Sequence, residues 1–168
     1  MDFNRIYILG TSGAGKTTAA NLLSKKLKIP SYDLDDLFWK RKYDVKRNEK
    51  ERQQLLIKIC NKRRWIIEGV YDKWVEEAIK KSDLVLLLDI HPFLLTCRLL
   101  KRFFKRRKKE DRGSWRDNIA LILYVWRYKH ENQAAGYLLH KQLIERNKRK
   151  HVHIKTTQQL KNFLNDIH

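Results

Sequence analysis

Short apolar runs alternate with longer amphipathic stretches along the whole chain. Residues 5–9, 65–69 and 84–89 are mostly aromatic, leucine or isoleucine, and two further strand candidates lie at 29–33 and 151–154. Runs of this length and composition predict buried strands, and the amphipathic stretches between them predict crossover helices. The alternation therefore predicts an α/β fold with a parallel sheet of five strands.

The helices are marked by the spacing of apolar residues and by side chains that cap helix N-termini. Ala20, Leu23 and Leu27 form one stripe of a helix predicted over 17–27. Capping side chains predict four further helix starts. These are Asn48 with Glu51, Asp72 for a helix that runs to Lys81, Ser114 with Asp117, and Thr156 with Gln159.

Other segments are harder to assign from the pattern. Residues 35–47 are rich in charged and aromatic side chains and predict a loop or a short helix. His91-Pro92 opens a long helix, with proline in its first turn, and the basic tail of this helix runs into Gly113, a predicted loop tip. Helix then continues to about Arg146, with a possible break at Gly136. The basic segment at 105–115 is therefore interpreted as a lid between two helices.

The length of 168 residues suits one domain with a sizeable core, so we expect residues 1–168 to form a single unit that carries the lid.

Cys60 and Cys97 are far apart in the sequence, which favours two free thiols in a reducing compartment. The N-terminus does not follow the pattern of a secretory signal. Since no apolar run is long enough to cross a bilayer, we expect a cytoplasmic protein without a membrane span. The oligomeric state stays open.

The charge of the chain is strongly unbalanced. Thirty-eight lysines and arginines oppose 19 acids, which gives a net charge of +19. The field of such a chain attracts polyanions, whether nucleotides, nucleic acid or anionic lipid. The basic residues are dense between Arg98 and Arg116. Two interpretations stay open for them, a solvated helix face or arginines that handle phosphate.

One motif carries specific chemistry. Residues 10–17 read Gly-Thr-Ser-Gly-Ala-Gly-Lys-Thr, which is the G-x-x-x-x-G-K-[ST] pattern of a phosphate-binding P-loop between a strand and a helix. The backbone N–H groups would surround the phosphates, Lys16 would contact the β and γ oxygens, and the Thr17 hydroxyl would bind Mg²⁺. The residues predicted to hold the triphosphate are Gly10, Thr11, Ser12, Gly13, Ala14, Gly15, Lys16, Thr17 and Thr18.

Acidic side chains follow the strands that neighbour this loop. Asp33 and Asp35 end the second predicted strand, Glu68 the third and Asp89 the fourth. Ligands of open α/β sheets bind at these carboxyl ends. Asp35 is the candidate to orient or deprotonate an acceptor hydroxyl, and Asp33 or Glu68 would hold Mg²⁺ through water. Helix capping or a surface ion pair is the alternative for each acid.

Phe38 and Trp39 lie beside these acids and would wall a substrate pocket or pack in the core. His151 and His153 share one face of a strand, but two histidines without further ligands are weak evidence for a metal site.

Five blocks of the sequence match a known pattern together. They are 8–17, Leu34-Asp35-Asp36-Leu37-Phe38-Trp39, Trp65-Ile66-Ile67-Glu68-Gly69-Val70-Tyr71, the strand to Asp89, and Arg98 to Arg102. In these blocks the chain resembles the adenylate-kinase-related proteins labelled DNA topology modulation proteins. More distantly, Asp33-x-Asp35 is similar to the acidic pair of shikimate-kinase-like enzymes, in which one acid organises Mg²⁺ and the other meets the acceptor hydroxyl.

The resemblance implies the nucleoside-monophosphate-kinase type of fold, with five parallel strands in the order 2-3-1-4-5 and a mobile lid. Glu68 and Val70 stand where the resemblance leads us to expect Asp and Asn. A likeness of fold does not fix the acceptor.

These observations predict an ATP-dependent, Mg²⁺-requiring kinase of the nucleotide or nucleoside class that acts on a small molecule. Arg102, Arg106 and Arg127 are the candidates to contact the γ-phosphate. The alternative is an ATP-binding regulator associated with nucleic acid through the basic surface. A GTPase is disfavoured, because no N-K-x-D-like guanine motif is present.

Overall fold

The structure is a computed structural model that describes residues 3–41, 44–107, 115–130 and 136–167. Its centre is a five-stranded parallel sheet in the order β2-β5-β1-β6-β7. The strands are β2 (Ser31–Asp33), β5 (Trp65–Gly69), β1 (Arg5–Gly10), β6 (Leu84–Leu88) and β7 (His151–Ile154). All five correspond to strands expected from the sequence, and their spatial order is the predicted 2-3-1-4-5.

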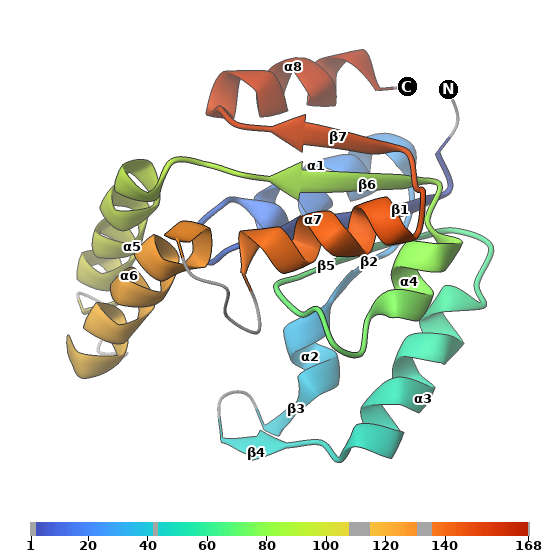
Figure 1. Ribbon diagram of the computed structural model, residues 1–168, viewed down its shortest axis with the longest axis horizontal. Coiled ribbons are helices and arrows are strands. Elements are labelled where there is room, and N and C mark those ends of the chain that lie inside the picture. Colours follow the sequence, from blue (N-terminus) through green and yellow to red (C-terminus); the bar gives the residue numbers. More distant parts are fainter. Residues whose placement is uncertain (1–2, 42–43, 108–114, 131–135, 168) are drawn as a thin grey trace.

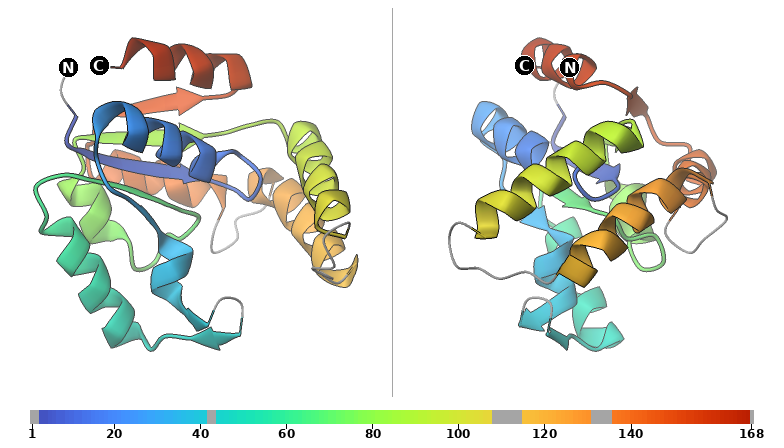
Figure 2. Two further views of the ribbon diagram at one scale, coloured as in Figure 1. Left: turned by 180° about the vertical axis from the view of Figure 1, so that it is seen from behind. Right: turned by 90° about the vertical axis from the view of Figure 1, so that its left-hand side faces the viewer.

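Alternate residues of the strands pack into two cores, one on each face of the sheet. Ile6 and Ile8 of β1 face the core that is covered by α1 (Lys16–Leu27), α5 (Pro92–Arg107) and α8 (Thr157–Asp166). Tyr7 and Leu9 face the core that is covered by α3 (Glu49–Cys60), α4 (Glu76–Lys81) and α7 (Tyr137–Arg146). Side chains that alternate between two buried faces explain why the central strands β1, β5 and β6 read as mostly apolar runs. Figures 1 and 2 show the resulting three layers.

Two predicted caps are confirmed and one is wrong. The Asn48 side chain accepts from Glu51 N at the start of α3, and Thr156 with Gln159 forms a capping box at α8. Asp72 does not cap the next helix, because α4 begins at Glu76 with Val75 as its N-cap. A capping side chain reaches only the first turn of its helix, and Asp72 lies too far upstream. Ser114, the remaining cap, lies outside the described residues.

The segment between β2 and α3 forms more structure than the sequence predicts. The short helix α2 (Leu34–Phe38) leads into an antiparallel pair, β3 (Trp39–Arg41) and β4 (Val45–Lys46). Strands of two and three residues cannot show a two-residue period, so the sequence pattern misses them. This segment extends away from the sheet below β2 in Figure 1.

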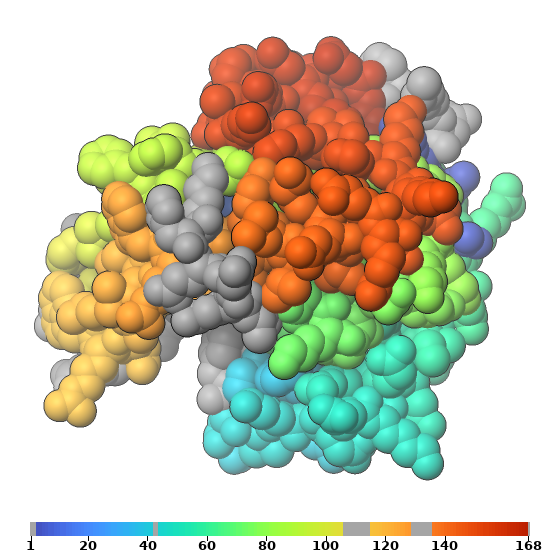
Figure 3. Space-filling view, viewed as in Figure 1, coloured from blue at the N-terminus to red at the C-terminus, as the bar shows by residue number. Residues whose placement is uncertain are grey.

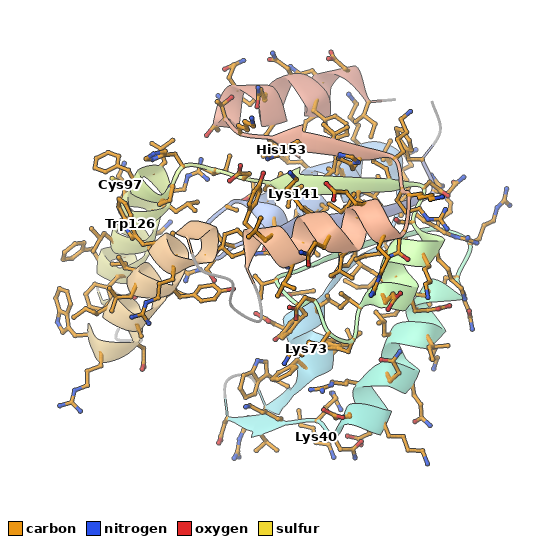
Figure 4. All side chains as sticks on the ribbon, viewed as in Figure 1. Lys40, Lys73, Cys97, Trp126, Lys141 and His153 are labelled. Carbon is orange, nitrogen blue, oxygen red and sulfur yellow. The ribbon has the colours of Figure 1, made fainter. Side chains whose placement is uncertain are left out.

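Helices α5 and α6 (Trp115–His130) form an arm at the left of Figure 1. Trp126 Nε1 of α6 donates to Thr96 Oγ1 of α5 at 3.1 Å, and Figure 4 shows Trp126 close to Cys97. The predicted lid would lie at the end of this arm. Residues 108–114, including Gly113, lie outside the described residues, so the lid stays a prediction.

Cys60 and Cys97 are both free thiols, as expected. Among the described residues, no helix is long and apolar enough to cross a membrane.

Candidate functional site

The P-loop connects the central strand β1 to α1 at the carboxyl edge of the sheet. A Cβ atom on Gly10 would lie 2.7 Å from the Leu88 carbonyl oxygen, so a side chain there would collide with β6. Gly15 has a φ of 97° at the N-cap of α1, a conformation that favours glycine. No side chain of the described residues caps α1, so its N-terminal end is open to an anion.

Lys16 lies at the centre of the predicted site. Its Nζ donates to the Thr11 carbonyl oxygen at 3.1 Å. Burial lowers the pKa of Lys16; the charges of Glu68, Asp35 and Asp33 oppose this shift, and that of Arg102 adds to it. The side chains that raise and lower this pKa are therefore those that the sequence predicts for the site.

Thr17 and Glu68 connect the P-loop to the neighbouring strand β5. The Thr17 hydroxyl donates to Glu68 Oε1 at 2.5 Å, and Glu68 is only 4% exposed. Burial raises the pKa of this carboxyl, while Lys16 and the Thr17 hydroxyl lower it. A hydroxyl and a carboxylate at the phosphate end of the loop are oxygen donors that suit Mg²⁺.

The described residues contain no group of three or more His, Cys, Asp or Glu side chains that could hold a metal ion. Mg²⁺ commonly binds through one or two protein oxygens together with substrate phosphates and water. The Thr17 and Glu68 pair fits that mode of binding better than it fits a metal cage made of protein alone.

Asp33 ends β2 as predicted, but Asp35 lies in the first turn of α2 and not in the strand, and the two aspartates have different environments. Asp33 Oδ1 accepts from Asp35 N at 2.8 Å and so caps α2, while the role of Asp33 toward Mg²⁺ stays a prediction. Asp35 Oδ1 accepts from the Tyr71 hydroxyl at 2.9 Å. Tyr71 follows β5, so its hydrogen bond fixes Asp35 from across the edge of the sheet.

Of the three arginines that the sequence predicts to contact the γ-phosphate, the structure describes the side chains of Arg102 and Arg127. Arg102 lies near enough to Lys16 to affect its pKa, and Arg127 is exposed on α6. The side chain of Arg106 lies outside the described residues. Arg98, which the sequence shows only as one member of a basic run, donates to the Gly13 and Ala14 carbonyl oxygens at 3.1 and 3.3 Å. It also donates to Thr157 Oγ1 at 2.7 Å and so joins the P-loop to α5 and α8.

A cavity of about 880 Å³ lies beside the Tyr71 side chain. Tyr71 belongs to its lining and also donates to Asp35. The lining residues are Phe38, Glu49, Lys50, Arg52, Gln53, Val70, Tyr71, Asp72, Lys73, Trp74, Glu76 and Glu77. They come from α2, α3, the segment after β5 and the start of α4. The colours of these elements lie against each other in the space-filling view (Figure 3). Figure 4 labels Lys73 beside α2.

Aromatic rings form one wall of this cavity. Phe38 and Tyr71 are stacked with ring centres 5.0 Å apart, and Trp74 lies 5.3 Å from Tyr71. The Arg52 guanidinium lies 5.2 Å from the Phe38 ring centre and 5.5 Å from that of Trp74. Phe38 therefore lines this cavity and stacks on Tyr71, and the binding of a substrate there stays a prediction. The contributions of Trp74 and Arg52 carry no motif and were missed.

A buried histidine supports the segment after β5. His140 of α7 is fully buried, with Nδ1 2.6 Å from the Tyr128 hydroxyl and Nε2 3.0 Å from the Val70 carbonyl oxygen. A carbonyl oxygen can only accept, so Nε2 carries the proton and Nδ1 accepts from Tyr128. Burial lowers the pKa of His140 to about 4, and the positive charge of Lys16 adds to the shift.

Asp89 and His153 form a separate pair. Asp89 Oδ2 lies 3.0 Å from His153 Nε2, and Asp89 is 6% exposed. The fourth strand-end acid therefore has a partner on β7, the His153 side chain that is labelled in Figure 4.

The chain was compared with protein families and with known proteins, and both kinds of comparison found matches. A family model described as "AAA domain" matches residues 6–120. The "Uncharacterized protein YqaC" of Bacillus subtilis (strain 168) is 36% identical over 106 residues, a match that covers 62% of this chain and 60% of that protein. The match therefore spans less than two thirds of the curated relative.

Solved structures share the fold at low sequence identity. A shikimate kinase from Bacteroides thetaiotaomicron is 18% identical with a TM-score of 0.56, and the match covers 98% of this chain and 96% of that one. A gluconokinase from Sinorhizobium meliloti 1021 is 12% identical with a TM-score of 0.54, and the match covers 96% and 87%. The fold of this chain is thus that of P-loop kinases.

Proposed function

The chain belongs to the AAA domain family, and from that premise we propose that it is an ATP-dependent, Mg²⁺-requiring kinase of the nucleotide or nucleoside class. It would transfer the γ-phosphoryl group to a hydroxyl of a small organic acceptor. The observation that carries the proposal is the cluster around Lys16. Glu68, Asp33, Asp35 and Arg102 all act on the pKa of this lysine, and Asp35 accepts a hydrogen bond from Tyr71, which lines a cavity.

Phosphoryl transfer depends on positioning and on neutralising charge. Residues 10–18 would hold the triphosphate, with Lys16 on the β and γ oxygens. Thr17 and Glu68 would hold Mg²⁺, which supplies positive charge at the phosphate oxygens, and Asp33 would contact it through water. Arg102, Arg106 and Arg127 would close over the γ-phosphate and exclude water.

Asp35 is proposed to meet the acceptor. Its Oδ1 accepts from Tyr71, which leaves Oδ2 to accept the hydroxyl proton of an acceptor in the cavity. We also propose that the chain is related to adenylate kinases and to the DNA topology modulation proteins, the families that its sequence resembles.

The test is a screen of ATP consumption over nucleosides, nucleoside monophosphates and small hydroxy compounds. Lys16→Ala should abolish turnover, because the positive charge that Lys16 would place beside the γ-phosphate is lost. Asp35→Asn should keep ATP affinity and lose transfer by about 10²-fold or more, the range of a general base. ATP affinity in Asp35→Asn as poor as in Lys16→Ala would contradict the role of Asp35.

The basic surface supports a second candidate function, an ATP-binding protein that acts on nucleic acid with little transfer. Lys101, Lys105 and Arg116 are exposed on the arm formed by α5 and α6. Binding to DNA through such charges should weaken steeply as salt rises. Salt-sensitive DNA binding together with a screen in which no acceptor stimulates turnover would favour this candidate over the kinase.

A further inference from the structure

The arm formed by α5 and α6 gathers most of the large hydrophobic side chains that reach the surface. Of the eleven such side chains that are exposed among the described residues, seven belong to these two helices. Each of the seven exposes between 44% and 61% of its surface. Single exposed hydrophobic residues are ordinary, whereas a cluster of them marks a surface that binds a partner.

On α6 the exposed side chains form one stripe. Trp115, Ile119, Leu123 and Trp126 are four, four and three residues apart, the spacing that puts side chains on one face of a helix. Tyr128, on the opposite face, is buried. The helix therefore has one face that packs against the rest of the molecule and a second apolar face that is turned outward.

The exposed side chains of α5 continue this face. They are Phe93, Leu94 and Phe104. At one end of the arm the ring centres of Phe104 and Trp115 are 6.4 Å apart, and at the other end Trp126 Nε1 donates to Thr96 Oγ1. The right-hand view of Figure 2 shows the two helices side by side at the front of the molecule. We call the seven exposed hydrophobic residues of α5 and α6 the arm face.

Positive charge borders the arm face. Helix α5 contains six lysines and arginines and no acid, and α6 contains three against one aspartate. Lys101 stands three residues before Phe104, and Arg116 stands three residues before Ile119. Residues at this interval are neighbours on a helix surface, and both basic side chains are exposed. The arm face is therefore an apolar strip with basic residues along its edge.

This combination suits an anionic lipid surface better than two other partners. A symmetric pair of this chain would press two positive arms together, and like charges repel where water is excluded. Nucleic acid would satisfy the charges, and its bases could stack on the aromatic rings. It offers no aliphatic surface to cover Ile119 and Leu123. An anionic bilayer offers both an apolar layer and a negative field.

We propose that the arm face binds the surface of an anionic lipid bilayer. Ile119 and Leu123 enter the boundary between headgroups and acyl chains, and Lys101 and Arg116 lie against the lipid phosphates. Both helices lie along the surface, so this mode of binding needs no helix that crosses the membrane. The proposal concerns where the protein binds. It goes beyond the proposed kinase function and does not depend on it.

The experiment floats the full chain with lipid vesicles. One set contains phosphatidylcholine with about 30% phosphatidylglycerol and the other contains phosphatidylcholine alone; the chain should bind the first set at least about tenfold more tightly. Ile119→Gln combined with Leu123→Gln leaves the net charge unchanged and removes two apolar side chains. This α6 variant should bind the anionic vesicles about tenfold or more weakly than wild type.

The matched control is Leu22→Gln combined with Ile57→Gln. It makes the same two replacements at exposed positions of α1 and α3, which lie away from the arm (Figure 1). The control should bind the vesicles as wild type does. Circular dichroism reports whether each variant folds. If the α6 variant does not fold, Leu123→Gln alone should weaken binding by a smaller factor.

The absence of binding to the anionic vesicles would overturn the proposal, and so would equal binding to both sets. Vesicle binding that the folded α6 variant leaves unchanged would assign the attraction to the overall charge of the chain and would also overturn it. Duplex DNA is tested with the same variants. Binding to DNA but not to vesicles, lost in the α6 variant, would assign the arm face to nucleic acid instead.

Discussion

Glu68 is a carboxylate held almost entirely out of water beside the Thr17 hydroxyl. A buried acid with a raised pKa needs a positive partner. Burial raises the pKa of Glu68, whereas the charge of Lys16 and the hydrogen bond from Thr17 both lower it. A divalent cation at this point would add the missing charge and would explain why an acid is retained in the core edge.

The first prediction therefore concerns Glu68→Gln. Removing the charge should raise the Mg²⁺ concentration that half-saturates ATP turnover by about 10-fold or more, the usual effect of losing a group that supports a metal site. A Mg²⁺ titration measures this value. Glu77→Gln, which changes an ion-paired glutamate on α4, should leave it unchanged. Equal Mg²⁺ requirements in wild type and Glu68→Gln would exclude Glu68 from the metal site.

For individual residues, the sequence predicts those that belong to a contiguous motif. It misses those whose contacts join positions far apart in the sequence. Residues 10–17 are contiguous, so their spacing alone identifies the P-loop. Arg98 meets Gly13 and Ala14 from 85 and 84 residues away, and His140 meets Val70 from 70 residues away. No local pattern marks such pairs, because the sheet order brings them together.

At the scale of elements, the Arg98 side chain connects the P-loop, α5 and α8, and we call this set of hydrogen bonds the Arg98 clamp. A guanidinium on α5 holds two carbonyl oxygens of the P-loop and the first residue of α8. The clamp therefore fixes the P-loop conformation that presents its N–H groups to phosphate.

Arg98→Ala should consequently lower the free energy of unfolding by about 2 kcal/mol, the scale of hydrogen bonds made by a charged group. The KM for ATP should rise as well, because the loop loses its fixed shape. Urea denaturation and ATP kinetics provide the two readouts. Lys101→Ala, an exposed change on the same helix, should affect neither. A variant as stable as wild type would show that Arg98 does not clamp the loop.

Element prediction succeeds here where hydrophobic runs are long and fails where elements are short. The three central strands β1, β5 and β6 are buried on both faces and therefore read clearly in the sequence. The pair β3 and β4 has three and two residues, too few to show a period. The start of α4 was misplaced because Asp72 has the right residue type for a cap but lies in the cavity lining.

Across the whole molecule, His140 couples stability to pH. It joins α6 and α7 to the segment after β5 and stays neutral because its pKa is lowered to about 4. An unfolded histidine titrates near 6.5, so the unfolded state binds more protons between about pH 6.5 and 4. Stability contributed by this residue is present above that window and is lost as the pH falls through it.

We therefore expect acidification from pH 7 to pH 4 to remove about 3 kcal/mol of stability through His140. Denaturation at a series of pH values should show a shallower dependence for His140→Gln, which cannot titrate. His151→Gln, at an exposed strand end, should behave as wild type does. The same acid dependence in His140→Gln and wild type would assign the effect to other groups.

The central claim is that Lys16 and Asp35 serve one reaction, the transfer of a phosphoryl group from ATP to an organic hydroxyl. The most direct measurement is ³¹P NMR of ATP, Mg²⁺ and the pool of candidate acceptors with wild type, Lys16→Ala and Asp35→Asn. The account predicts a phosphate monoester signal that grows with ADP in wild type and is absent in both variants, while Asp35→Asn still binds ATP. Inorganic phosphate as the sole new signal in wild type, with no ester formed, would contradict it.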